Sequence, residues 1–175
     1  MKTSVLFNKL GSYPLSFNMG EMLKLPSKWI AGFSAGEISF NLTLENKSSY
    51  KLGLRPRVSI SLPQDKRDLS ILISIQNHLG CGFIRTRSLN IPGRLPVCEF
   101  QVNAFKDILN VVLPFFNANP LLTRISKRLN YLDLEAIMRL VERKEHLSQS
   151  GLDQIRTIIA KMNRKREYPE FPLGA

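Results

Sequence analysis

The chain has few acidic residues for its size. Its 175 residues include 14 Asp and Glu against 25 Lys and Arg, which gives a formal net charge of +11. Only 22% of the residues are charged and 43% are hydrophobic, so the composition excludes a charge-rich disordered chain and is sufficient for one buried core. The surplus of positive charge predicts an acidic partner such as a nucleic acid.

Cysteine and histidine are also scarce, and long apolar runs are missing. Cys81 and Cys98 are the only cysteines and lack CxxC spacing, which excludes a disulfide framework and a zinc finger. His78 and His146 stand far apart with no third ligand at a suitable spacing, so we expect both to be structural. No run of 18 apolar residues occurs, and no membrane partner is predicted.

Glycine and proline punctuate the first 26 residues, which show no sustained helical or strand period. This segment contains two lysines and lacks the arginines of a presequence, so we expect a retained, extended N-terminal arm at 1–26. A single domain is predicted over 27–166, followed by a short C-terminal tail at 167–175.

A short helix of unusual composition is predicted from Ser27, a good N-cap, to Glu37. Each glycine inside a helix costs about 1 kcal/mol relative to alanine, and two occur here. Small residues four apart allow a second backbone to approach closely. The helix is therefore predicted to pack against a similar helix through a small-residue interface, which comprises Ala31, Gly32, Ala35 and Gly36.

Strand periodicity follows this helix. Apolar and polar residues alternate over 38–45 and again over 54–62. Two further strands are predicted, one that carries Arg85 and Arg87 and one around residues 98–102, separated by a Pro92-Gly93 turn. The remaining segments have helical patterns. Helices are predicted at 66–79, capped by Asp65 and ended by Gly80, at 104–116 after Asn103, at 130–144, and at 149–162 after Ser148.

The element order α-ββ-α-ββ-α, followed by two helices, predicts an α+β fold. A four-stranded antiparallel sheet would carry the helices on one face and leave the other face bare and polar. Such a face matches a nucleic-acid groove, with arginines as phosphate or guanine contacts. The candidate nucleic-acid-binding residues on it are Asn41, Thr43, Arg55, Arg57, Ser59, Arg85, Arg87 and Gln101.

The segment Trp29-Ile30-Ala31-Gly32-Phe33-Ser34-Ala35-Gly36-Glu37 resembles the signature helix of the LAGLIDADG homing endonucleases. The stretches 75–82, 120–123 and 144–151 also look like parts of that family, in the same order. The likeness extends over about residues 26–166 and is nearest to the second half of the two-repeat, monomeric members.

The resemblance implies a specific chemistry. Glu37 matches the metal-binding acid, and one such acid from each of two paired helices would hold Mg²⁺ over the scissile phosphates. Gln64 resembles a residue near the cleavage centre, and either Lys127 or Arg128 falls near the basic residue that stabilises charge on the phosphate. Members with one signature helix are homodimers, so a chain with one helix needs a second copy or a second half.

Two positions depart from the family pattern. Ile38 replaces the glycine that usually follows the acid, and a branched residue restricts the backbone there. Pro63-Gln64-Asp65 replaces the frequent Thr-Gln-His and places a residue without an N–H in a strand. Both departures weaken the expectation of nuclease activity.

Three functions remain open from the sequence. The first is an intron-encoded, Mg-dependent DNA endonuclease, active as a homodimer or with a second half. The second is a maturase-like protein that binds structured RNA, and the third is a former endonuclease retained in a ribonucleoprotein such as an organellar ribosome. We expect a basic nucleic-acid-binding protein of this descent, with degenerate nuclease activity, in an organelle and most simply in the mitochondrion.

Overall fold

The computed structural model of the chain describes residues 24–87, 96–122 and 125–162. Most of the predicted arm (1–26), the Pro92-Gly93 turn and the predicted tail (167–175) lie outside these ranges. The described part contains one antiparallel sheet and a set of helices, which confirms the predicted α+β class.

The sheet has four strands in the order β1-β2-β4-β3. Each neighbouring pair is antiparallel, and the long strand β2 joins the two hairpins by pairing with β1 along one part and with β4 along the other. The strands are β1 (Ser39–Asn46), β2 (Leu54–Asp65), β3 (Phe83–Arg87) and β4 (Val97–Val102).

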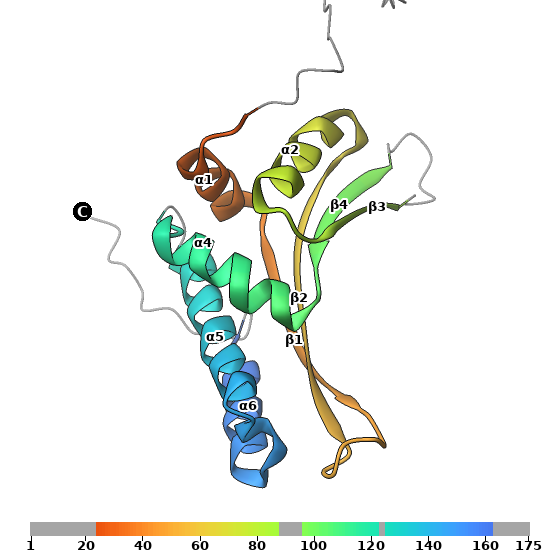
Figure 1. Ribbon diagram of the computed structural model, residues 1–175, viewed down its shortest axis with the longest axis vertical. Coiled ribbons are helices and arrows are strands. Elements are labelled where there is room, and N and C mark those ends of the chain that lie inside the picture. Colours follow the sequence, from red (N-terminus) through yellow and green to blue (C-terminus); the bar gives the residue numbers. More distant parts are fainter. Residues whose placement is uncertain (1–23, 88–95, 123–124, 163–175) are drawn as a thin grey trace, which may run out of the picture.

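The helices lie on one side of this sheet (Figure 1). A 3-10 turn at Lys66–Asp68 leads into α2, a π turn at Ile108–Val112 connects α3 to α4, and a 3-10 turn at Glu145–Leu147 connects α5 to α6. The helices are α1 (Ser27–Glu37), α2 (Leu69–Leu79), α3 (Phe105–Asp107), α4 (Leu113–Ala118), α5 (Ile125–Glu142) and α6 (Gln149–Lys161).

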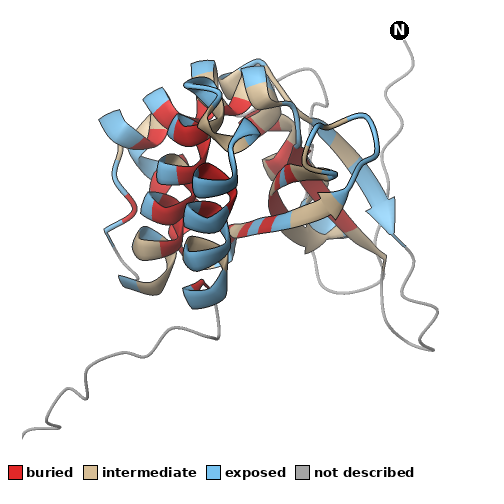
Figure 2. Cartoon of the chain, turned by 90° about the horizontal axis from the view of Figure 1, so that it is seen from below, coloured by how far each residue is buried: buried red, intermediate tan, exposed pale blue. Residues whose placement is uncertain are grey.

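The core lies between the helices and the sheet. Alternate strand residues, such as Phe40, Ile60 and Phe100, are at most 4% exposed, and they pack against Ile30 and Leu134 from the helices. Figure 2 shows the buried residues gathered on the facing sides of the two layers. None of the described helices covers the opposite face of the sheet.

Most of the predicted element ends are confirmed. Asp65 accepts a hydrogen bond from the Arg67 amide at 2.9 Å, and Gly80 ends α2 in the left-handed conformation with φ 67°. Ser148 caps α6 by accepting from the Gly151 amide at 3.1 Å.

Three predicted helix starts were wrong. The N-cap of α1 is Pro26 rather than Ser27, whose hydroxyl lies 3.1 Å from His78 Nε2 on α2. The helical segment after β4 starts with Ala104 as its cap, without a side-chain bond from Asn103. Helix α5 begins at Ile125 rather than at residue 130. Its first turn is polar, but it still contacts another part of the chain, since Lys127 donates to the Ile38 carbonyl.

Both prolines of β2 fit the strand register. Pro56 pairs with Leu44 of β1 in a stretch that β4 does not reach, and Pro63 pairs with Glu99 of β4 in a stretch beyond the end of β1. In each place β2 has one neighbour only, so the missing N–H can face the unpaired edge. Pro63 therefore lies within a strand, as the sequence predicted, at a point where β2 has a neighbour on one side only.

We expect Gly151→Ala to destabilise the fold. A Cβ at this first-turn position of α6 would lie 2.5 Å from the backbone carbonyl carbon of Glu145, and backbone has little room to move. Overpacking of this kind costs ~1–3 kcal/mol, or a fall in Tm of roughly 2–10 °C. Gly32→Ala is the matched control in thermal melts, since its Cβ would meet nothing within 4 Å. Equal melting temperatures for the two variants would contradict the close contact.

Candidate nucleic-acid interface and catalytic acid

Glu37 is the last residue of α1, and its side chain is exposed. Within the described ranges, its carboxylate has no hydrogen-bond or salt-bridge partner. A negative charge at a helix C-terminus is unfavourable because it faces the negative end of the helix dipole. An unpaired acid held in this position is available to a cation from outside the chain.

Lys127 of α5 lies at the same end of α1. Its ammonium donates a hydrogen bond to the Ile38 carbonyl, one residue beyond Glu37. Arg128 is exposed and makes no such contact with the part of the chain that the structure describes. Of the two basic residues that the sequence left open, Lys127 is therefore the one placed beside the acid.

The bend after Glu37 is regular despite Ile38. The residue is extended, with φ −62° and ψ 142°, its amide donates to the Ser34 carbonyl, and its side chain is buried. A branched residue adopts this conformation without strain. The restriction that Ile38 places on the backbone therefore causes no strain at this bend.

Gln64 lies on β2 opposite Cys98 of β4. Because side chains alternate along a strand, Gln64 shares the helix-covered face with Leu62, whereas Pro63 and Asp65 share the open face. Hydrogen bonds from the Arg67 amide and guanidinium lower the pKa of Asp65. The register does not direct Gln64 toward the arginine-bearing face, so its predicted role at the cleavage centre stays a prediction.

Divalent-metal binding requires more ligands than this end of α1 supplies. The described residues contain no group of three His, Cys, Asp or Glu side chains that could hold a metal ion. Mg²⁺ is commonly held by one or two carboxylates together with substrate phosphates and waters. The single carboxylate of Glu37 can supply one ligand of such a site, and the other ligands must come from elsewhere.

The open face of the sheet carries the polar residues that the alternation predicted. Asn41 pairs with Ser59 and Thr43 with Arg57 across β1 and β2, while Arg85 of β3 pairs with Glu99 of β4. The face thus extends over all four strands. Its arginines come from β2 and β3.

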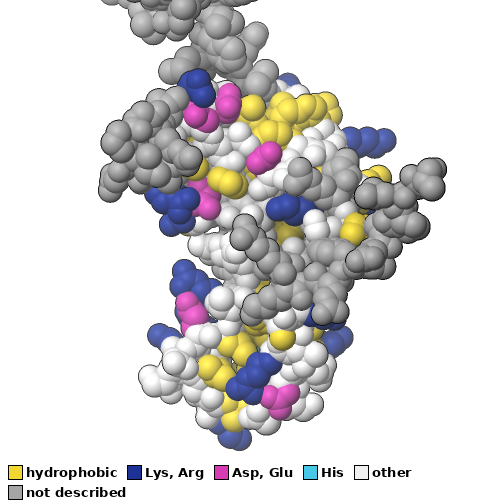
Figure 3. Space-filling view, turned by 180° about the vertical axis from the view of Figure 1, so that it is seen from behind, with side chains coloured by type: hydrophobic (Ala, Val, Ile, Leu, Met, Phe, Trp, Pro, Cys, Tyr) yellow, Lys and Arg dark blue, Asp and Glu magenta, His cyan; other side chains and the backbone are white. Residues whose placement is uncertain are grey.

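Most of these arginines are already paired with acids. Glu45 accepts from Arg55 at 2.9 Å and from Arg57 at 2.5 Å, and Glu99 accepts from Arg85 at 2.8 Å. Basic and acidic side chains accordingly lie next to one another in Figure 3. Glu45 was not among the predicted site residues, although its alternation with Thr43 on the same strand places it on this face.

Part of the face is closed rather than bare. Glu99 and Gln101 are 9% and 7% exposed, and Ser61 beside them is 5% exposed. Burial alone would raise the pKa of Glu99, but hydrogen bonds from Arg85, Gln101 and Ser61 lower it. Gln101 is buried in this network, and its predicted contact with nucleic acid stays a prediction.

The outer side of α1 is apolar and open. No atom lies within 4 Å of a Cβ placed on Gly32 or Gly36, and the exposed Trp29 stacks on Phe33 with ring centroids 5.1 Å apart. These four residues follow the i, i+3, i+4, i+7 spacing of one helix face. Trp29 and Phe33 were not among the predicted interface residues, although this spacing is visible in the sequence.

Ala31 and Ala35 do not belong to that open side. They are 4% and 0% exposed and pack into the chain's own core. Each lies one position, or about 100° around the helix, from a neighbouring glycine. The predicted interface is therefore corrected to the glycines with the two aromatic residues.

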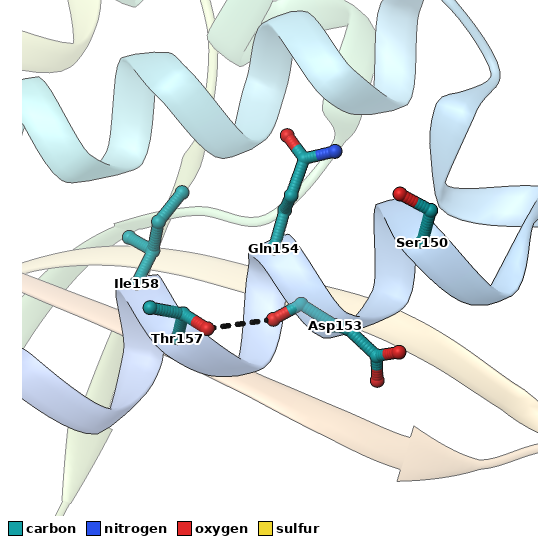
Figure 4. A pocket seen from close by; sticks show the side chains of 5 residues that line it. All are labelled: Ser150, Asp153, Gln154, Thr157 and Ile158. Carbon is teal, nitrogen blue, oxygen red and sulfur yellow. Dashed lines mark hydrogen bonds between the residues drawn. The ribbon is translucent and has the colours of Figure 1, made fainter.

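A separate hollow runs along α6. It is lined by Ser150, Asp153, Gln154, Thr157 and Ile158, all from this one helix (Figure 4). The Thr157 hydroxyl donates to the Asp153 carbonyl, and the Asp153 carboxylate is paired with Arg156. Both groups are already engaged within the helix, so the hollow offers no reactive side chain from this pair.

No helix in the described ranges is long and apolar enough to cross a membrane.

Comparison with known proteins gives consistent results. The sequence profile of the LAGLIDADG endonuclease family matches residues 30–138. "Probable intron-encoded endonuclease 2" of Neurospora crassa is 34% identical over 140 residues, which cover 79% of this chain and 28% of that protein.

Two solved structures are also similar. The LAGLIDADG homing endonuclease I-LtrWI, bound to target DNA, is 33% identical with a TM-score of 0.75 over 90% of this chain and 48% of its own. I-SmaMI, bound to cleaved DNA, is 32% identical with a TM-score of 0.72 over 81% of this chain and 45% of its own. The chain thus spans about half of these structures and about a quarter of the N. crassa protein. It belongs to the LAGLIDADG endonuclease family.

Proposed function

We propose that the chain acts as one half of a LAGLIDADG DNA endonuclease. The sheet face would bind duplex DNA, and Glu37 would supply one of two acids for metal-dependent hydrolysis of the phosphodiester backbone. The observation that carries this proposal is the exposed carboxylate of Glu37 at the end of α1, which has no partner among the described residues and lies next to Lys127. The stability of the fold does not account for an acid at that position, because a negative charge at a helix C-terminus is unfavourable.

Each group has a separate role in this mechanism. The polar face of the sheet binds and orients the duplex, which brings a phosphate to the C-terminal end of α1. Bound there, Mg²⁺ would neutralise phosphate charge and activate the attacking water. Glu37 would provide a hard oxygen ligand for the ion, and the positive charge of Lys127 would stabilise the charge that develops on the phosphate.

The second acid must come from another LAGLIDADG unit. The open side of α1 at Gly32 and Gly36 can accept a second helix at close range, and the chain spans about half of the related structures. A second copy of this chain and a different second half are both compatible with that surface. A ribonucleoprotein partner, the remaining prediction from the sequence, needs no second helix on this face.

Binding of structured RNA, as a maturase-like protein or a ribosomal component, is the alternative function. An RNA-bound protein without chemistry has no use for an exposed acid at a helix C-terminus, so Glu37 favours the nuclease over a degenerate form. We further propose an intron-encoded origin in an organelle, with the mitochondrion as the first choice. The N. crassa relative is named as a probable intron-encoded endonuclease, which supports the proposed intron-encoded origin.

The proposal can be tested by selecting ligands from a randomised duplex-DNA library and from a structured-RNA pool with the full-length chain. We expect enrichment of a duplex sequence, and native mass measurement should find two LAGLIDADG units for each complete site. Two copies on a pseudo-palindromic site would identify a homodimer. Preferential enrichment of RNA, with an unselected DNA pool, would overturn the proposal in favour of the RNA-binding alternative.

A further inference from the structure

We propose that Glu45 and Glu99 are positioning residues, which hold three arginines of the sheet in orientations suited to reading guanine bases. This inference rests on the proposed binding of duplex DNA by the sheet. It assigns Glu45 and Glu99 a role in sequence specificity. A count of the positive charges on this face would not suggest such a role for acids.

Glu45 lies beneath two arginines at the distal end of the β1–β2 hairpin. Its side chain is 31% exposed, whereas those of Arg55 and Arg57 are 40% and 57% exposed. Oε2 accepts from Arg55 Nη2 and Oε1 accepts from Arg57 Nη1. Arg55 is the cross-strand partner of Glu45, and Arg57 is two residues further along the same face. One carboxylate therefore contacts both guanidinium groups, each through one nitrogen.

Glu99 holds Arg85 in the same way on the other hairpin. Its side chain is 11% exposed against 51% for the arginine, and Oε2 accepts from both Nε and Nη2 at 3.0 and 2.8 Å. The hydrogen bonds that lower the pKa of Glu99 keep it ionised and in its acceptor form. Arg85 retains three further N–H donors, which include the whole of Nη1.

The geometry favours bases over phosphates for two physical reasons. A bidentate contact with O6 and N7 of guanine requires a guanidinium plane of fixed orientation, and a carboxylate at one edge supplies that constraint. The same carboxylate repels phosphate, because Arg55, Arg57 and Glu45 together carry one net positive charge and not two. The O6 and N7 atoms of guanine are uncharged acceptors and do not meet this repulsion.

Arg87 provides an internal comparison. It lies two residues after Arg85 on β3, is exposed, and has no acidic partner among the residues that the structure describes. An arginine of this kind is suited to a phosphate contact. Arg87→Ala is expected to lower the dependence of log affinity on log salt concentration by about one unit, without changing the selected sequence.

The decisive variant is Glu45→Gln, which keeps the size of this half-buried side chain. Asp153→Asn is the matched control, because it removes one negative charge and frees Arg156 on α6, a helix on the covered side of the sheet. The full-length chain would be used to select from a randomised duplex library, and its affinity for a fixed nonspecific duplex would be measured at several salt concentrations.

We expect Glu45→Gln to lose about tenfold of its preference for guanine at one or two selected positions. Its nonspecific binding should become tighter at low salt, with a salt slope steeper by about one unit. Asp153→Asn should match the parent in both measurements. An unchanged selected sequence in Glu45→Gln would overturn the inference, as would weaker nonspecific binding. If the parent enriches no duplex at all, the proposed function itself fails, and this inference fails with it.

Discussion

Gly32→Leu and Gly36→Leu are each expected to abolish association of the chain with its second half, while the chain itself stays folded. In the single chain, a Cβ at either position meets nothing within 4 Å, and leucine has a helix propensity better than glycine by up to about 1 kcal/mol. In the pair, the same side chain would hold two helices apart at their closest approach. Overpacking there costs ~1–3 kcal/mol for each contact, which a symmetric pair would incur twice.

Sedimentation and thermal melts measure the two effects separately. The leucine variants should sediment as single chains with a Tm equal to or above that of the parent. Ala160→Leu, an exposed position on α6, adds comparable bulk elsewhere and should leave the assembly unchanged. If the variants assemble as the parent does, the open side of α1 is not the interface, and Glu37 cannot meet a second acid in the proposed manner.

The sheet was the most predictable part of the fold. Period-two alternation over β1 and β2 defines both faces once antiparallel pairing is assumed, since a register slip by one residue would expose Phe40 and Ile60. Gly80 could be predicted because a left-handed C-cap favours glycine. Each of these signals is local, and the structure confirms each of them.

Helix starts were harder, because they depend on contacts between distant residues. Ser27 has the composition of an N-cap, yet its hydroxyl lies beside His78, 51 residues later in the chain. Helix α5 begins before its apolar period does. Tyr131 on that helix lies within hydrogen-bonding distance of the Leu113 carbonyl on α4, a contact that no local pattern contains.

The candidate site was predictable in its residue types and less so in its pairings. The resemblance to the family identified Glu37, but it left Lys127 and Arg128 equivalent, and only the packing of α5 against the end of α1 separates them. The arginines were visible in the sequence. Their neutralisation by Glu45 and Glu99 depends on strand register, which a count of charges ignores.

Glu37→Gln is expected to abolish Mg²⁺-dependent DNA cleavage and to leave the fold intact or more stable. The amide cannot replace the charged carboxylate oxygen that Mg²⁺ requires, so the loss should exceed the detection range of a cleavage assay. Removing a negative charge from the C-terminus of α1 relieves an unfavourable dipole interaction worth about 0.3–1 kcal/mol. Cleavage of the selected duplex and thermal melting would be measured with the assembled protein, since one chain supplies one acid.

Glu142→Gln makes the same chemical change near the end of α5, where the acid is paired with Arg139, and should leave cleavage unaltered. Loss of activity together with gained stability in Glu37→Gln, and neither in the control, is what a residue retained for chemistry produces. A large fall in stability would instead assign Glu37 a structural role, although the described residues give it no partner. An assembled parent that binds duplex DNA but never cuts it, at any Mg²⁺ concentration, would contradict the nuclease and leave the sheet face as a binding surface alone.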